Sequence, residues 1–257
     1  MKVLVITLNL FLVLLVLVVP VSAESVRDVI ETLEKPFRNT TPADSAVHDV
    51  EAEFTQEATI ESLDRTQSGS GRVFLRFERQ TLDRVPVVKF RWEYDRPARQ
   101  EIVSDGRTMW VYLPDNNQVI ESDIREVSEA RAQDPLTFLT GLGNLSRDFL
   151  IRFASPDRDA EGNYVLRLTP KTTTAMFREL LVSVDRRAVI DFTRSGVTGR
   201  DFPIHSTTAI DPNGNKTVIT FARNTLRLNR GISDLQFRFM MPAGVDVVRP
   251  TGERMGY

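Results

Sequence analysis

Cysteine is absent from this 257-residue chain, and histidine occurs only twice, at His48 and His205. Without cysteine the fold contains no disulfide, so its stability must come from a buried core, which a chain of this size can form. A lipid anchor on a cysteine behind a signal sequence is excluded for the same reason, and we expect a soluble mature product. His48 has no second ligand at helical or hairpin spacing, so the sequence predicts no zinc site.

Motifs for catalysis are also missing. The chain contains no Gly-x-Ser-x-Gly elbow, no His-Glu-x-x-His pair and no phosphate-binding glycine loop. Glu51, Glu53 and Glu57 alternate with apolar residues, which indicates the solvated face of a strand. The formal net charge of −2 gives no basic footprint for a nucleic acid. We therefore expect no enzyme, no cofactor and no nucleic-acid partner; hydrolysis of a lipid ester would contradict this expectation.

One long apolar run, residues 3–19, follows the basic Lys2 and ends at Pro20. The small residues of Val21-Ser22-Ala23 have the spacing that a signal peptidase requires, so the pattern predicts a cleaved signal peptide over residues 1–23. An uncleaved anchor is the alternative, because the run approaches the length that crosses a bilayer. Residues 24–257 are then predicted to form a single domain, although their length also allows two small ones.

Two segments have helical signals. Ser25 to Phe37 reads as an amphipathic helix with a capping-box-like start at Ser25 and Asp28. Asp134-Pro135 is a typical helix start, and a short apolar helix near residues 134–142 is predicted from it. Its apolar residues are Leu136, Phe138, Leu139 and Leu142.

Most of the remaining chain alternates with a period of two, as strands do. The strand candidates are residues 50–60, a segment opened by Gly69-Ser70-Gly71, and residues 89–94, 99–104, 108–113, 118–123, 149–154, 163–169, 177–185, 188–195, 204–210, 216–222 and 235–240. Residues 63–68 are predicted to form a polar turn, Asp105-Gly106 a hairpin turn, and residues 211–215 a further turn. This pattern predicts one curved antiparallel sheet of about eleven strands or more, open or closed.

Aromatic residues are concentrated in the first two thirds of the mature chain. They are Phe74, Phe90, Trp92, Tyr94, Trp110, Tyr112 and Phe138. A packed β core accounts for any one of them. Two apolar helices lying across a curved sheet would instead leave an internal apolar chamber, and composition does not distinguish the two.

The order of motifs resembles the periplasmic outer-membrane lipoprotein carrier family, of the LolA type. The matching motifs are Phe54-Thr55-Gln56, Gly69-Ser70-Gly71, Phe90-Arg91-Trp92-Glu93-Tyr94, Pro97, Glu101-Ile102-Val103-Ser104-Asp105-Gly106, Trp110-Val111-Tyr112-x-Pro114, Leu168-Thr169-Pro170-Lys171, Asn215-x-Thr217-x-Ile219-x-Phe221, and Phe237-x-Phe239-x-x-Pro242-x-Gly244-Val245-Asp246-Val247. Each motif is weak alone, but together they span nearly the whole mature chain in the right order.

The resemblance implies an incomplete, half-open β-barrel covered by short lid helices. It also implies a hydrophobic cavity that holds the acyl chains of a lipoprotein during transit across the periplasm. The carrier would act as a monomer and touch membranes only transiently, taking cargo from an ATP-driven inner-membrane complex and delivering it to an outer-membrane acceptor. On this basis the cavity is expected to be lined by Phe74, Phe90, Trp92, Tyr94 and Trp110, with lid contacts from Leu136, Phe138, Leu139 and Leu142.

The chain departs from the family pattern at the latch. The family often has Arg-Pro after the strand that follows Gly-x-Gly, and its arginine helps to fasten the lid. Here Phe77-Glu78 stand at that place, so Arg76 or Arg79 is the possible substitute. A relative that carries a glycolipid or free lipid, or an envelope-stress sensor of the same fold, is the alternative function.

Overall fold

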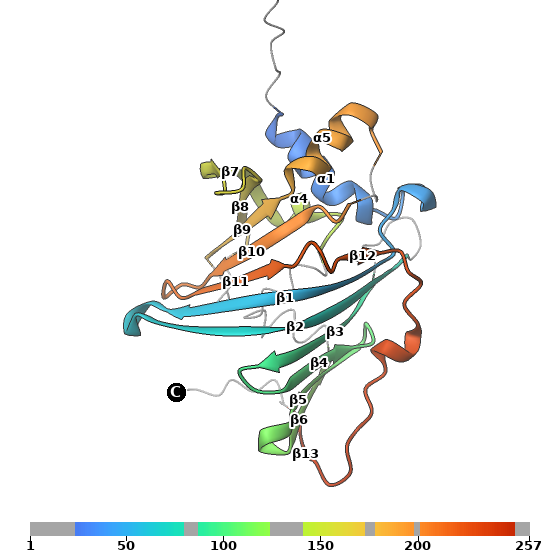
Figure 1. Ribbon diagram of the computed structural model, residues 1–257, viewed down its shortest axis with the longest axis vertical. Coiled ribbons are helices and arrows are strands. Elements are labelled where there is room, and N and C mark those ends of the chain that lie inside the picture. The colour runs from blue at the N-terminus through green and yellow to red at the C-terminus, as the bar shows by residue number, and fades with distance from the viewer. Residues whose placement is uncertain (1–23, 80–86, 124–140, 173–177, 198–200, 250–257) are drawn as a thin grey trace, which may run out of the picture.

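The computed structural model describes residues 24–79, 87–123, 141–172, 178–197 and 201–249. Within these ranges thirteen strands form one sheet in the order β13-β6-β5-β4-β3-β2-β1-β11-β10-β9-β8-β7, with the short β12 paired to β1 (Figure 1). The strands are β1 (Asp49–Ile60), β2 (Arg65–Glu78), β3 (Val87–Arg96), β4 (Gln100–Ser104), β5 (Thr108–Leu113), β6 (Gln118–Asp123), β7 (Phe149–Arg158), β8 (Tyr164–Pro170), β9 (Glu179–Val184), β10 (Ile204–Ile210), β11 (Lys216–Phe221), β12 (Arg227–Leu228) and β13 (Asp246–Val248). Neighbours pair antiparallel, except that β13 runs parallel to β6.

The sheet is not closed. β7 and β13 stand at opposite ends of the strand order, and no pairing joins them within the described residues. The predicted architecture, an incomplete barrel of mainly antiparallel strands, is confirmed. The short β12 and β13 were not predicted, because two or three residues are too few to show a period of two.

The two halves of the chain meet at the middle of the sheet. β1 pairs with β2 on one side and with β11 on the other, which sets Phe54 opposite both Gly71 and Phe221. The hairpin predicted at Asp105-Gly106 joins β4 to β5. The side chain of Asp105 accepts the backbone N–H of Thr108 at 2.8 Å, and Gly106 has a φ of 90°, which favours glycine.

The first helix begins and ends as its sequence predicts. α1 (Val26–Glu34) has a capping box, in which Ser25 and Asp28 each accept the other's backbone N–H. A 3-10 turn, η1 (Lys35–Phe37), extends it to Phe37. α1 lies beside the later helix α5 (Arg186–Ser195) at one end of the molecule (Figure 1). A single helical turn, α4 (Leu145–Asp148), precedes β7.

The prediction of a strand over residues 188–195 is wrong, because this segment forms α5. Ala188, Ile190 and Phe192 alternate as in a strand, but the segment carries helix signals at both ends. Asp185 caps the start by accepting the N–H of Ala188 at 2.8 Å, and Gly196 with φ 68° ends the helix. These local caps, with burial of Val189, outweigh the alternation.

The prediction of a strand over residues 235–240 is also wrong. The segment begins with the 3-10 turn η5 (Asp234–Phe237), where Ser233 accepts the N–H of Leu235, and continues without a sheet partner among the described residues. Phe237 is buried but Leu235 and Met240 are exposed, so the apolar alternation here does not mark one continuous buried face.

The polar turn predicted over residues 63–68 is shorter than expected. Three residues, Glu61–Leu63 (η3), and Asp64 with φ 45° make the turn, and β2 already begins at Arg65, which pairs with Ile60. Cross-strand pairing with β1 therefore continues through the polar residues 66–68.

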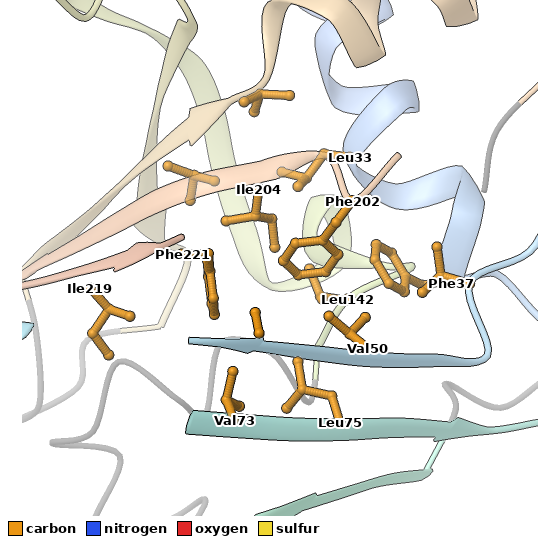
Figure 2. Packing of buried hydrophobic residues seen from close by; sticks show 14 of the residues in the cluster. Leu33, Phe37, Val50, Val73, Leu75, Leu142, Phe202, Ile204, Ile219 and Phe221 are labelled. Carbon is orange, nitrogen blue, oxygen red and sulfur yellow. The ribbon is translucent and has the colours of Figure 1, made fainter. Parts of the chain in front are cut away.

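A packed core joins the helices to the sheet. Figure 2 shows Phe37 and Phe202 between the β1–β2 and β10–β11 parts of the sheet, with Leu33 and Leu142 close by. The Phe37 and Phe202 rings lie 6.2 Å apart, and Phe202 meets Phe221 edge-on at 5.4 Å. All five side chains are at most 2% exposed. Within the described residues, no helix has the length and apolar character needed to span a membrane.

Candidate functional site

One face of the sheet is apolar across most of its strands. Directly paired residues of neighbouring strands point to the same side. One cross-strand row from β5 to β1 reads Val111, Ile102, Trp92, Val73 and Ala52. We call this side the inner face and the opposite side the outer face. The helices pack on the inner face, since Val29, Leu33 and Val189 join its buried cluster.

Three of the five aromatic residues predicted to line a cavity lie together on the inner face. Phe90, Trp92 and Tyr94 alternate along β3, and Trp92 is 0% exposed. The ring of Phe54 meets Trp92 at 4.7 Å and Tyr94 at 4.9 Å, edge-on in both cases. The Tyr94 hydroxyl donates a hydrogen bond to Oε1 of Gln56 at 2.8 Å. This pair is a polar contact on a mostly apolar surface.

The inner face is filled in the middle and more open toward both ends of the strand order. Trp92, Phe54 and Phe221 are almost fully buried. The side chains further out pack against this cluster but are only partly buried, namely Met109 and Val111 of β5 and Phe149, Ile151 and Phe153 of β7. A bulky apolar ligand therefore finds accessible apolar surface at the margins, whereas entry to the centre requires side chains to move.

Two buried polar atoms on this face lack a hydrogen-bond partner among the described residues. They are the indole nitrogen Nε1 of Trp92 and the hydroxyl oxygen of Ser122. The register of β5 and β6 sets Ser122 opposite Met109 and so on the inner face.

The other two predicted lining residues, Phe74 and Trp110, lie on the outer face. Phe74 pairs across the strands with Arg91, and Trp110 pairs with Glu121 and donates its indole N–H to that carboxylate at 3.3 Å. The Trp110 ring stacks on Phe239 at 5.7 Å. The sequence did indicate the outward orientation of Phe74. Arg72, Phe74 and Arg76 are spaced two residues apart on one strand, so they lie on the same face.

The outer face is crossed by a segment that we call the C-terminal strap, residues 229–248. Its η5 turn packs against β3, and Phe237 is 1% exposed. The buried carboxylate of Asp49 accepts the backbone N–H groups of Arg230 at 2.7 Å and Gly231 at 2.9 Å, which fixes the start of the strap. Asp49 was not among the predicted site residues, because its partners lie far away in sequence.

Ion pairs fix the strap further along. Asp234 lies 2.8 Å from Nζ of Lys89 and 3.3 Å from the guanidinium of Arg76. The hydrogen bond from Lys89 lowers the pKa of Asp234, with the charge of Arg76 acting in the same direction. Burial disfavours the charge on Lys89, but hydrogen bonds to Asp234 and Glu78 outweigh burial and raise the pKa of Lys89. Arg76, one of the two latch candidates, thus contacts the strap.

Arg79, the second latch candidate, contacts the helical end. Its guanidinium donates to the backbone carbonyl of Thr41, and the Thr41 hydroxyl donates to the carbonyl of Lys35, in η1. Arg79 therefore ties the end of β2 to the segment that follows α1.

An unpredicted cluster binds the end of α1 to α4 and to the residues just before α4. The carboxylate of Glu34, 2% exposed, accepts hydrogen bonds from Arg38 at 2.6 Å and from the N–H of Ser146 at 2.7 Å. Arg38 also donates to the carbonyl of Gly143 at 3.3 Å. Leu142 beside it is 1% exposed. The other predicted lid residues, Leu136, Phe138 and Leu139, lie outside the described residues.

A separate pocket of about 190 Å³ lies between α1 and α5. Its lining mixes apolar with charged groups, so it does not continue the apolar inner face; the lining includes Thr32, Pro36, Phe192, Asp191, Arg194 and Asp201. Across the described residues, no group of three histidine or acidic side chains is placed to hold a metal ion.

Comparison with known proteins gives consistent similarities. Residues 45–240 match a family model described as outer membrane lipoprotein carrier protein LolA. A protein of Methylobacillus flagellatus named outer-membrane lipoprotein carrier protein is 28% identical over 232 residues, which cover 90% of this chain and 93% of the relative. A protein of Nitrosospira multiformis with the same name is 30% identical over 200 residues, covering 77% and 81%. A solved LolA superfamily protein from Nitrosomonas europaea is 14% identical and covers 84% of this chain and 99% of that chain, with a TM-score of 0.39.

Proposed function

The chain belongs to the LolA family of outer membrane lipoprotein carriers, and from this we propose that it binds the acyl chains of lipoproteins and ferries them from the inner to the outer membrane. The observation that carries the proposal is the inner face. It is apolar across most strands, is covered by α1 and α5 at one end, and presents partly buried apolar side chains at its margins.

The physical requirement is the shielding of hydrocarbon from water. Exposure of an acyl chain costs about 0.8 kcal/mol per methylene, so a carrier between two membranes has to enclose it. No covalent step is needed, because binding and release alone move the cargo. This accounts for a chain without a catalytic motif.

We assign the lining of the binding site to Phe90, Trp92 and Tyr94, which share the inner face with Phe54. Phe74 and Trp110 are left out of this lining, since they face the other way. Leu142 is the lid contact that lies against the core, and Leu136, Phe138 and Leu139 stay predictions.

Loading requires the filled interior to open. Trp92, Phe202 and Leu142 are almost fully buried on the inner face, so acyl chains bound there would have to displace them, and loaded and empty forms must differ in packing. Cargo raises the population of the open form only to the extent that it binds the open form more tightly than the closed form. Arg79 contacts the Thr41 carbonyl, and in our proposal this contact holds the closed form and breaks on loading.

The proposed route begins with secretion through a signal peptide, residues 1–23. In the periplasm the protein, as a monomer, takes acylated lipoproteins from an ATP-driven inner-membrane complex and passes them to an outer-membrane acceptor. Its contact with either membrane is transient.

Binding of a fluorescent acyl probe tests the proposal. Val111→Glu puts a charge on the partly buried margin of the inner face and is expected to weaken binding by more than tenfold. Leu150→Glu is the matched control, because Leu150 is 62% exposed and its substitution is expected to leave binding unchanged. Leu139→Glu is expected to block binding while the protein stays folded.

Equal binding by folded Val111→Glu and wild type would contradict the site. Binding of a free phospholipid or glycolipid in place of acylated protein would keep the site but support the alternative, a lipid transporter or envelope-stress sensor of the same fold.

A further inference from the structure

The indole N–H of Trp92 is a hydrogen-bond donor without an acceptor among the described residues. Trp92 is 0% exposed, so bulk water does not reach it. Buried tryptophan N–H groups usually have a partner, and an unsatisfied buried donor is destabilising. An orphan donor at the centre of the proposed binding site therefore points to an acceptor that arrives with the ligand.

The neighbours of Trp92 do not supply that acceptor. On the inner face it is flanked across the strands by Val73 and Ile102, and the rings of Phe54 and Phe221 lie 4.7 and 6.3 Å away. The side-chain oxygen of Gln56 accepts the Tyr94 hydroxyl, and no described residue accepts the indole N–H of Trp92. The donor thus lies in an apolar environment of low dielectric constant, where a new hydrogen bond to a ligand stabilises the complex most strongly.

A row of inner-face residues leads from partly buried surface to this donor, and a ligand that follows it has to displace buried side chains. Trp92, Ile102 and Val111 occupy one cross-strand row on β3, β4 and β5, and exposure rises along it from fully buried Trp92 to partly buried Val111. A hydrocarbon chain entering at β5 would reach Trp92 after crossing one strand.

We propose that the indole N–H of Trp92 donates a hydrogen bond to the ester carbonyl of a bound acyl chain. The inference rests on the proposed function and adds a polar subsite to it. An ester carbonyl accepts and does not donate, whereas an indole only donates, so the two groups match. Because the carbonyl stands at a fixed place in an acyl chain, this bond sets how deeply the chain enters and favours acyl esters over plain hydrocarbon chains.

Trp110 provides a matched control. The chain contains two tryptophans, and the N–H of Trp110 already binds Glu121 on the outer face. Replacement of either indole by a phenyl ring removes one N–H and keeps an aromatic ring, but only Trp92 belongs to the proposed site.

The affinity test uses monopalmitoylglycerol and its ether analogue 1-O-hexadecylglycerol, which lacks the carbonyl oxygen, in competition with a fluorescent acyl probe. The wild type is expected to prefer the ester by about three- to tenfold, the worth of one hydrogen bond. Trp92→Phe is expected to lose this preference, and Trp110→Phe to keep it. The ratio is taken within each variant, so altered stability of a variant cancels. An unchanged preference in Trp92→Phe overturns the inference.

Nuclear magnetic resonance of the 15N-labelled wild type tests the same bond without substitution, with Trp110→Phe used to assign the two indole signals. The Trp92 indole proton is expected to move downfield with the ester and not with the ether, while Trp110 stays in place. The same shift with both ligands, or none while both bind, overturns the inference and leaves the carrier proposal standing. Failure of the wild type to bind either ligand overturns the carrier proposal itself.

Discussion

The carboxylate of Asp49 accepts a hydrogen bond from the backbone N–H of Arg230 at 2.7 Å, across 181 positions of sequence. Asp49 is 4% exposed and also accepts the N–H of Gly231, so one buried carboxylate fixes the start of the C-terminal strap to the start of β1. The strap in turn packs on the outer face over β3 and β5, on the side opposite to the proposed binding surface.

Asp49→Ala is expected to lower the free energy of unfolding by about 2 kcal/mol, because the N–H groups of the strap lose their buried acceptor. Urea denaturation measures this loss. Asp44→Ala is the control, since Asp44 is exposed and is expected to change stability by less than about 0.5 kcal/mol. Equal stability of the two variants would contradict the role of Asp49.

Asp159 is expected to make stability depend on pH on the acid side. Burial opposes its charge, but hydrogen bonds from Ser183 and Asn163 and from backbone N–H groups outweigh burial and lower its pKa. A lowered folded-state pKa stabilises the fold above the unfolded value of about 3.9, and this contribution is lost as the pH falls through the folded-state pKa.

Asp159→Asn is therefore expected to reduce the unfolding free energy by about 1 kcal/mol at pH 7, and the difference from wild type is expected to shrink below about pH 4. Asp157→Asn, two residues earlier on β7, is the control, because its side chain is exposed. Urea denaturation at several pH values gives the comparison. A gap between wild type and Asp159→Asn that stays constant from pH 7 to the acid limit would refute the assignment.

Arg76 and Arg79 are expected to have different effects when removed. Arg79→Leu breaks the contact with Thr41 that, in our proposal, holds the closed form, so an acyl probe is expected to bind several-fold more tightly. Arg76→Leu breaks the contacts with Asp234 and with the carbonyl of Ile232 instead. It is expected to make the strap more sensitive to protease and to leave probe affinity unchanged. If instead Arg76→Leu tightens probe binding and Arg79→Leu leaves it unchanged, Arg76 is the latch.

Local patterns were sufficient for most of the fold. β5, β6 and β10 have the predicted bounds, because a clear period of two is enclosed by turn residues such as Asp105-Gly106. The capping box of α1 is local too, and it was predicted. The family resemblance, which came from the order of short motifs, is confirmed.

The errors have physical causes that single-segment patterns do not contain. In α5 Ala188, Ile190 and Phe192 alternate as in a strand, but Ala188, Val189 and Phe192 also share one helical face, and the caps Asp185 and Gly196 decide for the helix. For the site, the family resemblance pointed to five aromatic residues, but strand register divides them between the two faces of the sheet. Contacts such as Asp49 with Arg230 join segments at opposite ends of the mature chain, and no local pattern reveals them.

Native mass spectrometry of the mature protein purified from its own periplasm tests the central claim most directly. The account predicts a complex whose added mass corresponds to a triacylated lipoprotein, with Val111→Glu giving the empty mass. A wild type that carries only free phospholipid or glycolipid would contradict the lipoprotein cargo, and a wild type that stays empty even after incubation with purified acylated lipoprotein would contradict the carrier account as a whole.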